Sequence, residues 1–544
     1  MKTMDVLVVG AGPAGLSAAI EARRYGAKVL LADEQDMPGG QLFKQIHKFF
    51  GSKKHWAGKR GYAIGMELFN EAQSMGVEIL LKTKVLGIFK DHFVSWIVDD
   101  RSMSGLKARC IVLATGGIEK AFTFPGWTLP GVITAGAAQT FCNIERVLPG
   151  KRVLMIGSGN VGLIVSFQLL QAGAEVAAVV EAAPSISGYL VHASKIRRAG
   201  VPIFTGQTIK EARGSTKIEE VVLRSVDGVH RHRAGTQKSF TVDTICLSVG
   251  LSPDTRLARM AGLSMYYAPQ LGGFLPVHDR TMKSSVEGIY IAGDLAGIEE
   301  ANTALDEGRL AGTCAAESLG FGDTNLFQHV RSELWQRLDG LRRGPFGHDR
   351  FICKQDIILT GSPERIPKDK RISNHPESEG KLKNVNGVPS LVDLQHLPGY
   401  PSPARIKRGA VACIECAEEI PCDPCVEACS FGAISIGPNI TDLPRLAEDK
   451  CRGCGLCITA CPGQVIFLMD YTFSEDKASL SLPYEFLPYP KTGERVWGVN
   501  RRGEPVATAE VLRVQTREDF DKTAIVTIAF DKKYIHHVRS FTKR

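Results

Sequence analysis

Short apolar runs followed by glycine-rich turns recur along the N-terminal half of the chain. Residues 6–9 form one such run, a turn follows at residues 10–15, and apolar positions then repeat with a helical period over residues 16–22. A second apolar run spans residues 29–32. Continuous apolar runs of this length are typical of strands buried on both faces of a parallel sheet. The pattern therefore predicts a strand, turn, helix and strand at the start of the chain.

The same order of elements returns later in the sequence. Residues 153–156 are apolar, a glycine turn covers residues 157–162, and a helical pattern to Gln171 precedes an apolar run at residues 174–180. Two units of this kind indicate an α/β fold with parallel sheets.

The C-terminal part of the chain has a different pattern. Residues 327–341 predict an amphipathic helix, and residues 354–410 are polar and rich in proline and glycine, which predicts a connector. Residues 506–514 and 522–530 are rich in β-forming residues, and the second stretch alternates between apolar and polar positions. We therefore expect a small β-rich tail.

Composition narrows the class of protein. The chain has 544 residues, of which 44% are hydrophobic and 23% charged, so it is long enough for several globular domains. The net charge of +8 lacks a dominant basic block, which argues against nucleic-acid binding. No apolar run approaches the roughly 20 residues of a membrane helix, and residues 1–5 lead straight into a strand. We expect a cytoplasmic protein without an integral membrane segment.

The first glycine turn has the features of a dinucleotide site. Gly10 permits a tight turn, Gly12 lets the backbone approach a pyrophosphate, and Gly15 lets the helix pack against the strand. The helix N-terminus faces the phosphates, and an acid at the end of the next strand can accept hydrogen bonds from ribose hydroxyls. The predicted site comprises Gly10, Gly12, Pro13, Ala14, Gly15, Asp33 and Glu34.

The second glycine turn repeats this arrangement. An acid again ends the strand, which favours an adenosine with a free 2′-hydroxyl, as in NAD(H) or ATP, although Arg197 and Arg198 could bind a 2′-phosphate. The turn is also compatible with a purely structural role. The predicted residues are Gly157, Gly159, Asn160, Val161, Gly162 and Glu181.

Nine of the fourteen cysteines lie between residues 413 and 461. The last four follow the spacing C-x-x-C-x-x-C-x-x-x-C-P, whose first three thiolates bind one [4Fe-4S] cluster while the fourth binds a second. Paired C-x-x-C motifs also occur in zinc sites, but triple runs that close with C-P favour a cubane. The candidate ligands are Cys413, Cys416, Cys422, Cys425, Cys429, Cys451, Cys454, Cys457 and Cys461.

Two clusters need eight of these nine cysteines. By its spacing Cys429 should join Cys451, Cys454 and Cys457, and Cys461 should join Cys425. Cys416 fits any arrangement. The remaining ligand is either Cys413 or Cys422, and spacing leaves both open.

The other five cysteines form no redox pair in the sequence. None belongs to a C-x-x-C or C-x-x-x-x-C motif, so thiol-disulfide chemistry is not expected. We expect these cysteines to be buried and to have structural roles. These cysteines are Cys110, Cys142, Cys246, Cys314 and Cys353.

Three further segments resemble the two-dinucleotide flavoprotein fold of thioredoxin and glutathione reductases. The turn of Ala114, Thr115 and Gly116 follows an apolar run, as does the turn of Gly293 and Asp294. The resemblance implies FAD, with the second turn at its pyrophosphate and ribityl chain. It also implies that Gly40 and Gln41 lie near the isoalloxazine ring.

A closer resemblance rests on residues 40–45, 50–58 and especially 124–139, which read Phe-Pro-Gly-Trp-Thr-Leu-Pro-Gly-Val-Ile-Thr-Ala-Gly-Ala-Ala-Gln. They resemble the large α subunit of heteromeric flavin-dependent amino- and imino-acid dehydrogenases, which include proline and hydroxyproline dehydrogenases, opine oxidase, hydrogen cyanide synthase and sarcosine oxidase α. The likeness covers residues 4–345. Several relatives have a four-cysteine [2Fe-2S] module where this chain has an apparent eight-ligand ferredoxin.

The resemblance implies an FAD-dependent oxidoreductase within a hetero-oligomer. A second flavoprotein, the β subunit, would contain the amine-oxidising site, and a ferredoxin or quinone-linked carrier would accept the electrons. No catalytic residue is assigned in this chain. A stand-alone NAD(P)H:acceptor oxidoreductase and a nucleotide-sensing scaffold subunit are the alternatives.

The expected domains follow from these motifs. Residues 1–125 and 275–330 form the FAD-binding domain, and residues 126–274 form the second nucleotide-binding domain. A helix and connector at 331–410, an α+β ferredoxin-like domain at 411–470 and a β-rich tail at 471–544 complete the chain.

Overall fold

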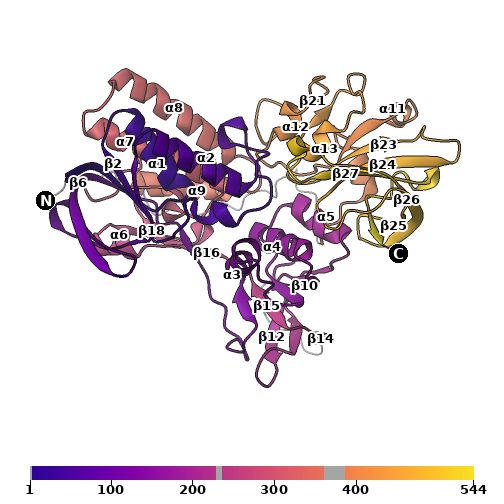
Figure 1. Ribbon diagram of the computed structural model, residues 1–544, viewed down its shortest axis with the longest axis horizontal. Helices are drawn as coiled ribbons and strands as arrows, with labels where there is room; N and C mark the ends of the chain where they lie inside the picture. Colours follow the sequence, from indigo (N-terminus) through magenta and orange to yellow (C-terminus); the bar gives the residue numbers. More distant parts are fainter. Residues whose placement is uncertain (1–2, 228–235, 361–385, 544) are drawn as a thin grey trace. The chain divides into compact units, whose positions relative to one another are not determined.

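The computed structural model describes residues 3–227, 236–360 and 386–543 (Figure 1). The chain divides into two units. The first comprises Met1–Ile46, Lys59–Lys120 and Gly250–Pro376, and the second comprises His47–Gly58, Ala121–Val249 and Glu377–Arg544. The short segment His47–Gly58 therefore belongs to the second unit, although residues of the first unit flank it on both sides in the sequence.

A seven-stranded sheet forms the centre of the first unit (Figure 1). The strand order is β3-β2-β1-β6-β5-β4, and β19 also pairs with β6. β1 runs parallel to β2 and β6, and its residues Val6 to Val9 are buried, which explains the continuous apolar run. The strands are β1 Thr3–Val9, β2 Val29–Ala32, β3 Glu78–Leu80, β4 Thr83–Ile88, β5 Phe93–Val98, β6 Ser102–Leu113 and β19 Ile289–Ile291.

Two helices pack closely beside this sheet. A Cβ atom at Gly308 of α7 would lie 2.1 Å from the Ala14 carbonyl oxygen of α1, and one at Gly312 would lie 2.2 Å from the Ala18 oxygen. The two glycines therefore permit the helices to touch along their backbones. The helices of this unit are α1 Pro13–Arg24, α2 Gly61–Ser74, α6 Arg256–Met260, α7 Ala301–Ser318, α8 Thr324–Leu341 and α9 His348–Thr360.

Helices also occur in the region predicted as a connector. The end of α9 lies in it, and so do α10 (Leu391–Gln395) and α11 (Pro403–Ile406) of the second unit. Residues 361–385 of that prediction lie outside the described residues. No helix in the described part of the chain is long and apolar enough to cross a bilayer.

A five-stranded parallel sheet contains the second glycine turn. Its order is β11-β10-β9-β15-β8, and a three-stranded sheet of β12, β13 and β14 accompanies it. The strands are β8 Val132–Thr134, β9 Arg152–Ile156, β10 Glu175–Val180, β11 Ile203–Phe204, β12 Gln207–Arg213, β13 Glu220–Ser225, β14 Lys238–Thr241 and β15 Thr244–Leu247. The helices are α3 Ala135–Gln139, α4 Asn160–Gln171 and α5 Leu190–Arg198.

The cysteine-rich region is attached to a seven-stranded sheet of order β20-β23-β24-β27-β26-β25-β28 (Figure 1). The strands that flank the cysteines, β20 and β23, pair with each other, and β23 pairs with β24 of the β-rich tail. The elements are β20 Val411–Ile414, α12 Pro424–Glu427, β21 Ile434–Ser435, β22 Arg445–Leu446, α13 Leu456–Ala460, β23 Ile466–Asp470, β24 Lys477–Tyr484, β25 Arg495–Val499, β26 Pro505–Gln515, β27 Ala524–Asp531 and β28 Ser540–Lys543.

Candidate functional site

The first glycine turn joins β1 to α1 through backbone contacts that leave no room for side chains at Gly10 and Gly15. Gly10 has a φ of +106°, and a Cβ atom there would lie 2.3 Å from the Ala114 carbonyl oxygen. A Cβ atom at Gly15 would lie 1.7 Å from the Gly10 oxygen. Around Gly12, in contrast, nothing lies within 4 Å of a built Cβ. α1 has no side-chain cap, and Pro13 occupies its first turn, so the helix N-terminus leaves room for a phosphate group.

The Asp33 carboxylate fixes this turn from the end of β2. The Ala11 amide donates to Asp33 Oδ2 at 2.5 Å, and the Gln35 amide donates to Oδ1 at 2.7 Å. Burial raises the pKa of Asp33, and these two backbone donors oppose the rise. The neighbouring Glu34 is exposed. Asp33 is therefore the acid that lies against the turn.

The segment of Gly40 and Gln41 also lies against the turn. The Gly39 amide donates to the Ala11 carbonyl at 2.7 Å, and a Cβ atom at Gly40 would lie 2.9 Å from Gly12 Cα. Gln41 is exposed. This contact brings the two predicted parts of the dinucleotide site together.

The end of β6 supplies a second loop. The Ala114 amide donates to the Val9 carbonyl at 2.9 Å, which ties β6 to β1 just before both turns. Thr115 Oγ1 donates to the Asp254 carbonyl at 2.8 Å, and Gly116 has a φ of +74° with open space around it.

The turn of Gly293 and Asp294 follows β19. A Cβ atom at Gly293 would lie 2.8 Å from Ala14 Cβ, so this turn contacts the start of α1. Burial raises the pKa of Asp294 to about 7. The Gly293 amide donates to Glu307 Oε2 at 3.1 Å.

A buried ion network behind that turn was not predicted from the sequence. Arg342 pairs at 2.6 Å with both Glu299 and Glu307, and Lys354 Nζ donates to Glu307 at 2.7 Å and to the Ala296 carbonyl at 2.8 Å. All four charged side chains are at most 4% exposed. The network thus connects α8 and α9 to the Gly293 turn. Its members lie between residues 299 and 354, and no spacing motif in the sequence connects them.

The second glycine turn has the same backbone geometry. Gly157 has a φ of +102°, and a Cβ atom at Gly162 would lie 2.3 Å from the Gly157 oxygen. The Ser187 hydroxyl, at 3.9 Å, is the one atom within 4 Å of a Cβ built at Gly159. Val161 packs against the apolar core of this sheet. The acid at the end of β10 is hydrogen-bonded to this turn. Glu181 accepts from the Ser158 amide at 3.0 Å and from its hydroxyl at 2.7 Å.

A loop after β10 lies across this turn. The Tyr189 amide donates to Asn160 Oδ1 at 2.7 Å, and the Ser187 hydroxyl donates to Glu181 at 3.3 Å. A Cβ atom at Gly188 would lie 2.8 Å from the Asn160 amide nitrogen. A nucleotide ribose at Glu181 would have to replace the bonds from these serine hydroxyls.

Eight of the nine predicted ligands lie in two sets of four. The first quartet is Cys416, Cys422, Cys425 and Cys461. The second quartet is Cys429, Cys451, Cys454 and Cys457. Both quartets border one apolar cluster, in which Cys457 is buried and five other cysteines pack at its edge. α12 and α13, which contain Cys425 and Cys457, contact each other.

Mutual electrostatic effects define the first quartet. Burial raises the pKa of Cys422 well above its ordinary value, and the thiols of Cys425, Cys461 and Cys416 add to the rise. Burial likewise raises the pKa of Cys416, with Cys461 and Cys425 as its nearest charged neighbours. Cys425 and Cys461 therefore lie near both Cys416 and Cys422, which brings the four side chains together.

Cys457 lies near the other three thiols of the second quartet and near Cys425 of the first. Burial raises the pKa of Cys457, and the thiols of Cys451, Cys454, Cys425 and Cys429 add to the rise. Backbone amides also reach this quartet. The Ala433 amide donates to Cys429 Sγ at 3.2 Å, and the Ala412 amide donates to Cys451 Sγ at 3.5 Å.

Cys413 lies elsewhere. It is fully buried in β20, within the core of the seven-stranded sheet. Burial raises its pKa to about 12, and the nearby Arg539 opposes the rise. The next residue but one, Glu415, pairs with Arg501 at 2.5 Å and with Arg539 at 2.6 Å. Cys413 therefore faces a buried ion network and not the other thiols.

The chemistry of the thiols and their surroundings is compatible with iron-sulfur clusters. All fourteen cysteines are free of disulfide bonds. No group of three or more Cys, His, Asp or Glu side chains within the described ranges is arranged to hold one metal ion. A cubane keeps its thiolates farther apart than one ion does, and apolar surroundings with amide-to-sulfur hydrogen bonds suit it.

The five remaining cysteines do not form pairs. Cys110, Cys246 and Cys314 are buried, and Cys142 and Cys353 are half-buried. Burial raises the pKa of Cys314 to about 12, which disfavours a reactive thiolate.

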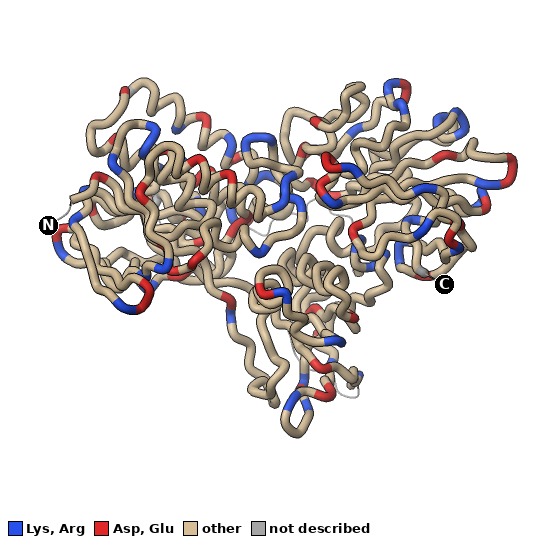
Figure 2. Tube along the Cα trace, viewed as in Figure 1, with Lys and Arg blue, Asp and Glu red and all other residues tan. Residues whose placement is uncertain are grey.

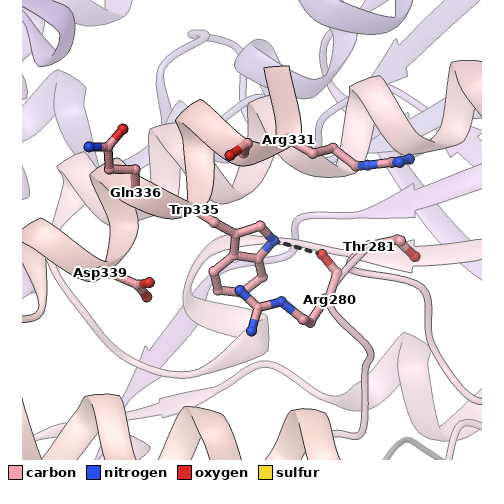
Figure 3. A pocket seen from close by; sticks show the side chains of 7 residues that line it. Arg280, Thr281, Arg331, Trp335, Gln336 and Asp339 are labelled. Carbon is pink, nitrogen blue, oxygen red and sulfur yellow. Dashed lines mark hydrogen bonds between the residues drawn. The ribbon is translucent and has the colours of Figure 1, made fainter. Parts of the chain in front are cut away.

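A pocket of about 680 Å³ lies in the first unit (Figure 3). Its cations are already engaged by the protein. The Arg280 guanidinium lies 4.6 Å from the Trp335 ring centroid, and Arg331 pairs with Glu317. The Trp335 indole also donates to the Arg280 carbonyl at 3.0 Å, as Figure 3 shows. None of the predicted site residues lines it.

Two glycine turns on parallel sheets, together with two thiol quartets, define an FAD-dependent oxidoreductase with an iron-sulfur domain. The chain belongs to the pyridine nucleotide-disulphide oxidoreductase family, whose model matches residues 4–308. Residues 444–467 match a 4Fe-4S binding domain.

Several named proteins and solved structures are similar to this chain. An opine oxidase subunit of Rhizobium meliloti (strain 1021) is 32% identical over 341 residues, which cover 59% of this chain and 72% of that protein. Hydrogen cyanide synthase subunit HcnB of Pseudomonas aeruginosa is 27% identical, with 66% of this chain and 84% of that protein covered. The crystal structure of L-proline dehydrogenase from P. horikoshii aligns with a TM-score of 0.48 and 24% identity, over 61% of this chain and 59% of that one.

Proposed function

We propose that this chain is the electron-transferring FAD and iron-sulfur subunit of a heteromeric amino- or imino-acid dehydrogenase. Its relatives are named as subunits of opine oxidase, hydrogen cyanide synthase and sarcosine oxidase, which supports a partner subunit. In this proposal, which follows the family resemblance of residues 124–139, the amine is oxidised on a partner flavoprotein and the donor is similar to proline or hydroxyproline.

One observation supports the proposal most strongly. A single chain contains a glycine turn suited to FAD and two quartets of thiols suited to one-electron clusters. Flavin supplies chemistry that accepts an electron pair and releases it singly. In this proposal Gly10, Gly12 and Gly15 admit the pyrophosphate, Asp33 binds the adenosine ribose, and Asp294 lies at the ribityl chain.

We assign the ligands of the two [4Fe-4S] clusters to the first and second quartets. Cys413 is then the spare cysteine, because it is buried in β20 against Arg539. We also propose that the second glycine turn, at Gly157, Gly159 and Gly162, binds NAD(H) or ATP. This nucleotide site is separate from the FAD site.

The proposal is tested by anaerobic rapid mixing. The chain, loaded with FAD and iron and combined with its partner flavoprotein, is mixed with proline, hydroxyproline or an opine while flavin absorbance is followed. We expect bleaching only when partner and amine are both present. Rapid bleaching of the isolated chain by NADH or NADPH, with no response to amines plus partner, would instead support a stand-alone NAD(P)H oxidoreductase.

A further inference from the structure

The two quartets differ in how the protein covers them. All fourteen cysteines lie in the described residues, and Cys454 of the second quartet is the one that is exposed. No member of the first quartet is exposed. An electron can leave a protein only where a carrier approaches a redox centre closely, so this difference bears on the exit route.

The segment His47–Gly58, which we call the strap, covers the first quartet from one side. Gly51 forms a backbone bridge with Cys422, and the Asp423 amide donates to the Gly51 carbonyl at 3.1 Å. A Cβ atom at Gly58 would contact the Pro424 ring at 3.5 Å. Lys48 is buried, and its Nζ donates to the Thr459 carbonyl at 2.7 Å.

Helix α5 covers the first quartet from another side. A Cβ atom at Gly463, two residues after Cys461, would lie 2.9 Å from Val191 Cβ. The Arg198 guanidinium, which is buried, donates to the Gln464 carbonyl at 2.7 Å. The first quartet is thus enclosed by the chain itself.

The loop of the second quartet meets solvent beside several cations. The buried Arg405 donates to the carbonyls of Ala410 at 3.0 Å and Cys451 at 3.1 Å, which fixes this loop next to α11. Four exposed cations surround it, and we call them the basic rim. They are Lys407, Arg408, Lys450 and Arg452.

Few acids oppose the basic rim. Asp449 is exposed and pairs with Arg408 at 3.2 Å, while the half-buried Glu448 accepts from the Ser402 amide and hydroxyl. Within the described residues, Lys407, Lys450 and Arg452 have no ion-pair partner. Blue segments lie around α11 in Figure 2. An excess of positive charge around a redox centre accelerates docking of a negatively charged carrier.

We propose that an acidic one-electron carrier protein docks on the basic rim and is reduced there through the second quartet. This inference rests on the proposed function, because electrons must first reach the clusters. Each encounter moves one electron to the carrier, and no bond or proton changes hands. Two encounters therefore remove the pair that one amine oxidation delivers.

The test measures binding of an acidic bacterial ferredoxin to the loaded chain under anaerobic conditions at several salt concentrations. The rim variant combines Lys450→Glu and Arg452→Glu. The control combines Lys151→Glu and Lys217→Glu, two exposed cations of the same unit, so that both variants change net charge equally. We expect the rim variant to bind roughly tenfold more weakly at low salt with a flatter salt dependence, and the control to change less than about twofold.

A conservative variant, Lys450→Arg with Arg452→Lys, should retain wild-type binding. Iron content and the electron paramagnetic resonance spectrum after dithionite reduction should be the same in all forms. Equal weakening of rim and control variants, or no weakening of either, would overturn the docking site. Binding needs no amine or partner flavoprotein, so failure of amine-dependent flavin reduction would count against the proposed function and leave this test intact.

Discussion

The two cysteine quartets arise from one repeated motif, yet the protein surrounds them differently. The first is enclosed by the strap and α5, and the second opens to solvent at Cys454 beside the basic rim. Ligand spacing differs between the quartets, since five residues separate Cys416 from Cys422, but spacing does not determine access to solvent. If both proposed clusters are present, the neighbours of each quartet, and not its ligands, would decide which cluster exchanges electrons with an external protein.

The two quartets also differ in the contacts that hold their loops in place. The first quartet begins next to Glu415, whose carboxylate binds Arg501 and Arg539 in the sheet core. The second quartet is anchored by Arg405 through backbone carbonyls. Variants can therefore damage one quartet while leaving the other intact.

The largest expected effect comes from removing one ligand of the first quartet. Cys422→Ser should lower bound iron by about half, because one cubane of two is lost. Cys413→Ser is the matched control and should retain all of the iron, since Cys413 faces Arg539. Iron and acid-labile sulfide assays measure both. Loss of iron in the Cys413 variant with full retention in the Cys422 variant would reverse the assignment.

A smaller effect is expected at the buried ion network. Glu415→Gln should lower the free energy of unfolding by about 3–5 kcal/mol, because Arg501 and Arg539 would lose their buried counter-charge. Urea unfolding of the loaded chain measures this value. Glu510→Gln, an exposed position in β26 of the same sheet, should change it by less than about 0.5 kcal/mol. Similar values for the two variants would contradict a structural role of Glu415.

Acid should weaken the same network without any mutation. Burial alone would raise the pKa of Glu415, but Arg539 and Arg501 hold it at about 2, below the ordinary 4.5. A carboxylate with a lowered folded-state pKa contributes stability above about pH 4.5 and loses it as pH falls towards 2. Unfolding curves of wild type should therefore decline over this range more steeply than those of Glu415→Gln. Parallel pH profiles would count against the network.

The smallest effect is expected at the strap. Lys48→Met removes donors from the Thr459 and Phe520 carbonyls and should cost about 1.5–3 kcal/mol of local stability. A chelator should then extract iron from the first quartet roughly tenfold faster, with the second quartet unchanged. Lys53→Met, an exposed strap position, is the control. Equal extraction rates in wild type and both variants would show that the strap does not protect the first quartet.

The sequence predicted the parts of the molecule that are local in the chain. Each glycine turn and its acid follow one strand, so Gly10 and Asp33 or Gly157 and Glu181 could be recognised by spacing. The triple cysteine run is local in the same sense. The chain's family and its FAD and 4Fe-4S domains agree with those predictions.

Contacts between distant segments could not be predicted. The strap has no periodic pattern that would place Gly51 beside Cys422. The burial of Cys413 depends on β20 pairing with β23, which places this side chain in the sheet core. Lys354 meets Glu307 only because α9 returns to the Gly293 turn. Such contacts depend on tertiary packing, which residue spacing does not encode.

In the proposed function, one polypeptide binds FAD and two inequivalent cubanes. The most direct test is a cofactor count on anaerobically purified chain combined with spectroscopy during titration with the acidic ferredoxin. We expect about eight iron atoms and one FAD per chain, with only one of two cluster signals perturbed by the carrier. About four iron atoms, bound zinc without sulfide, or equal perturbation of both signals would contradict it.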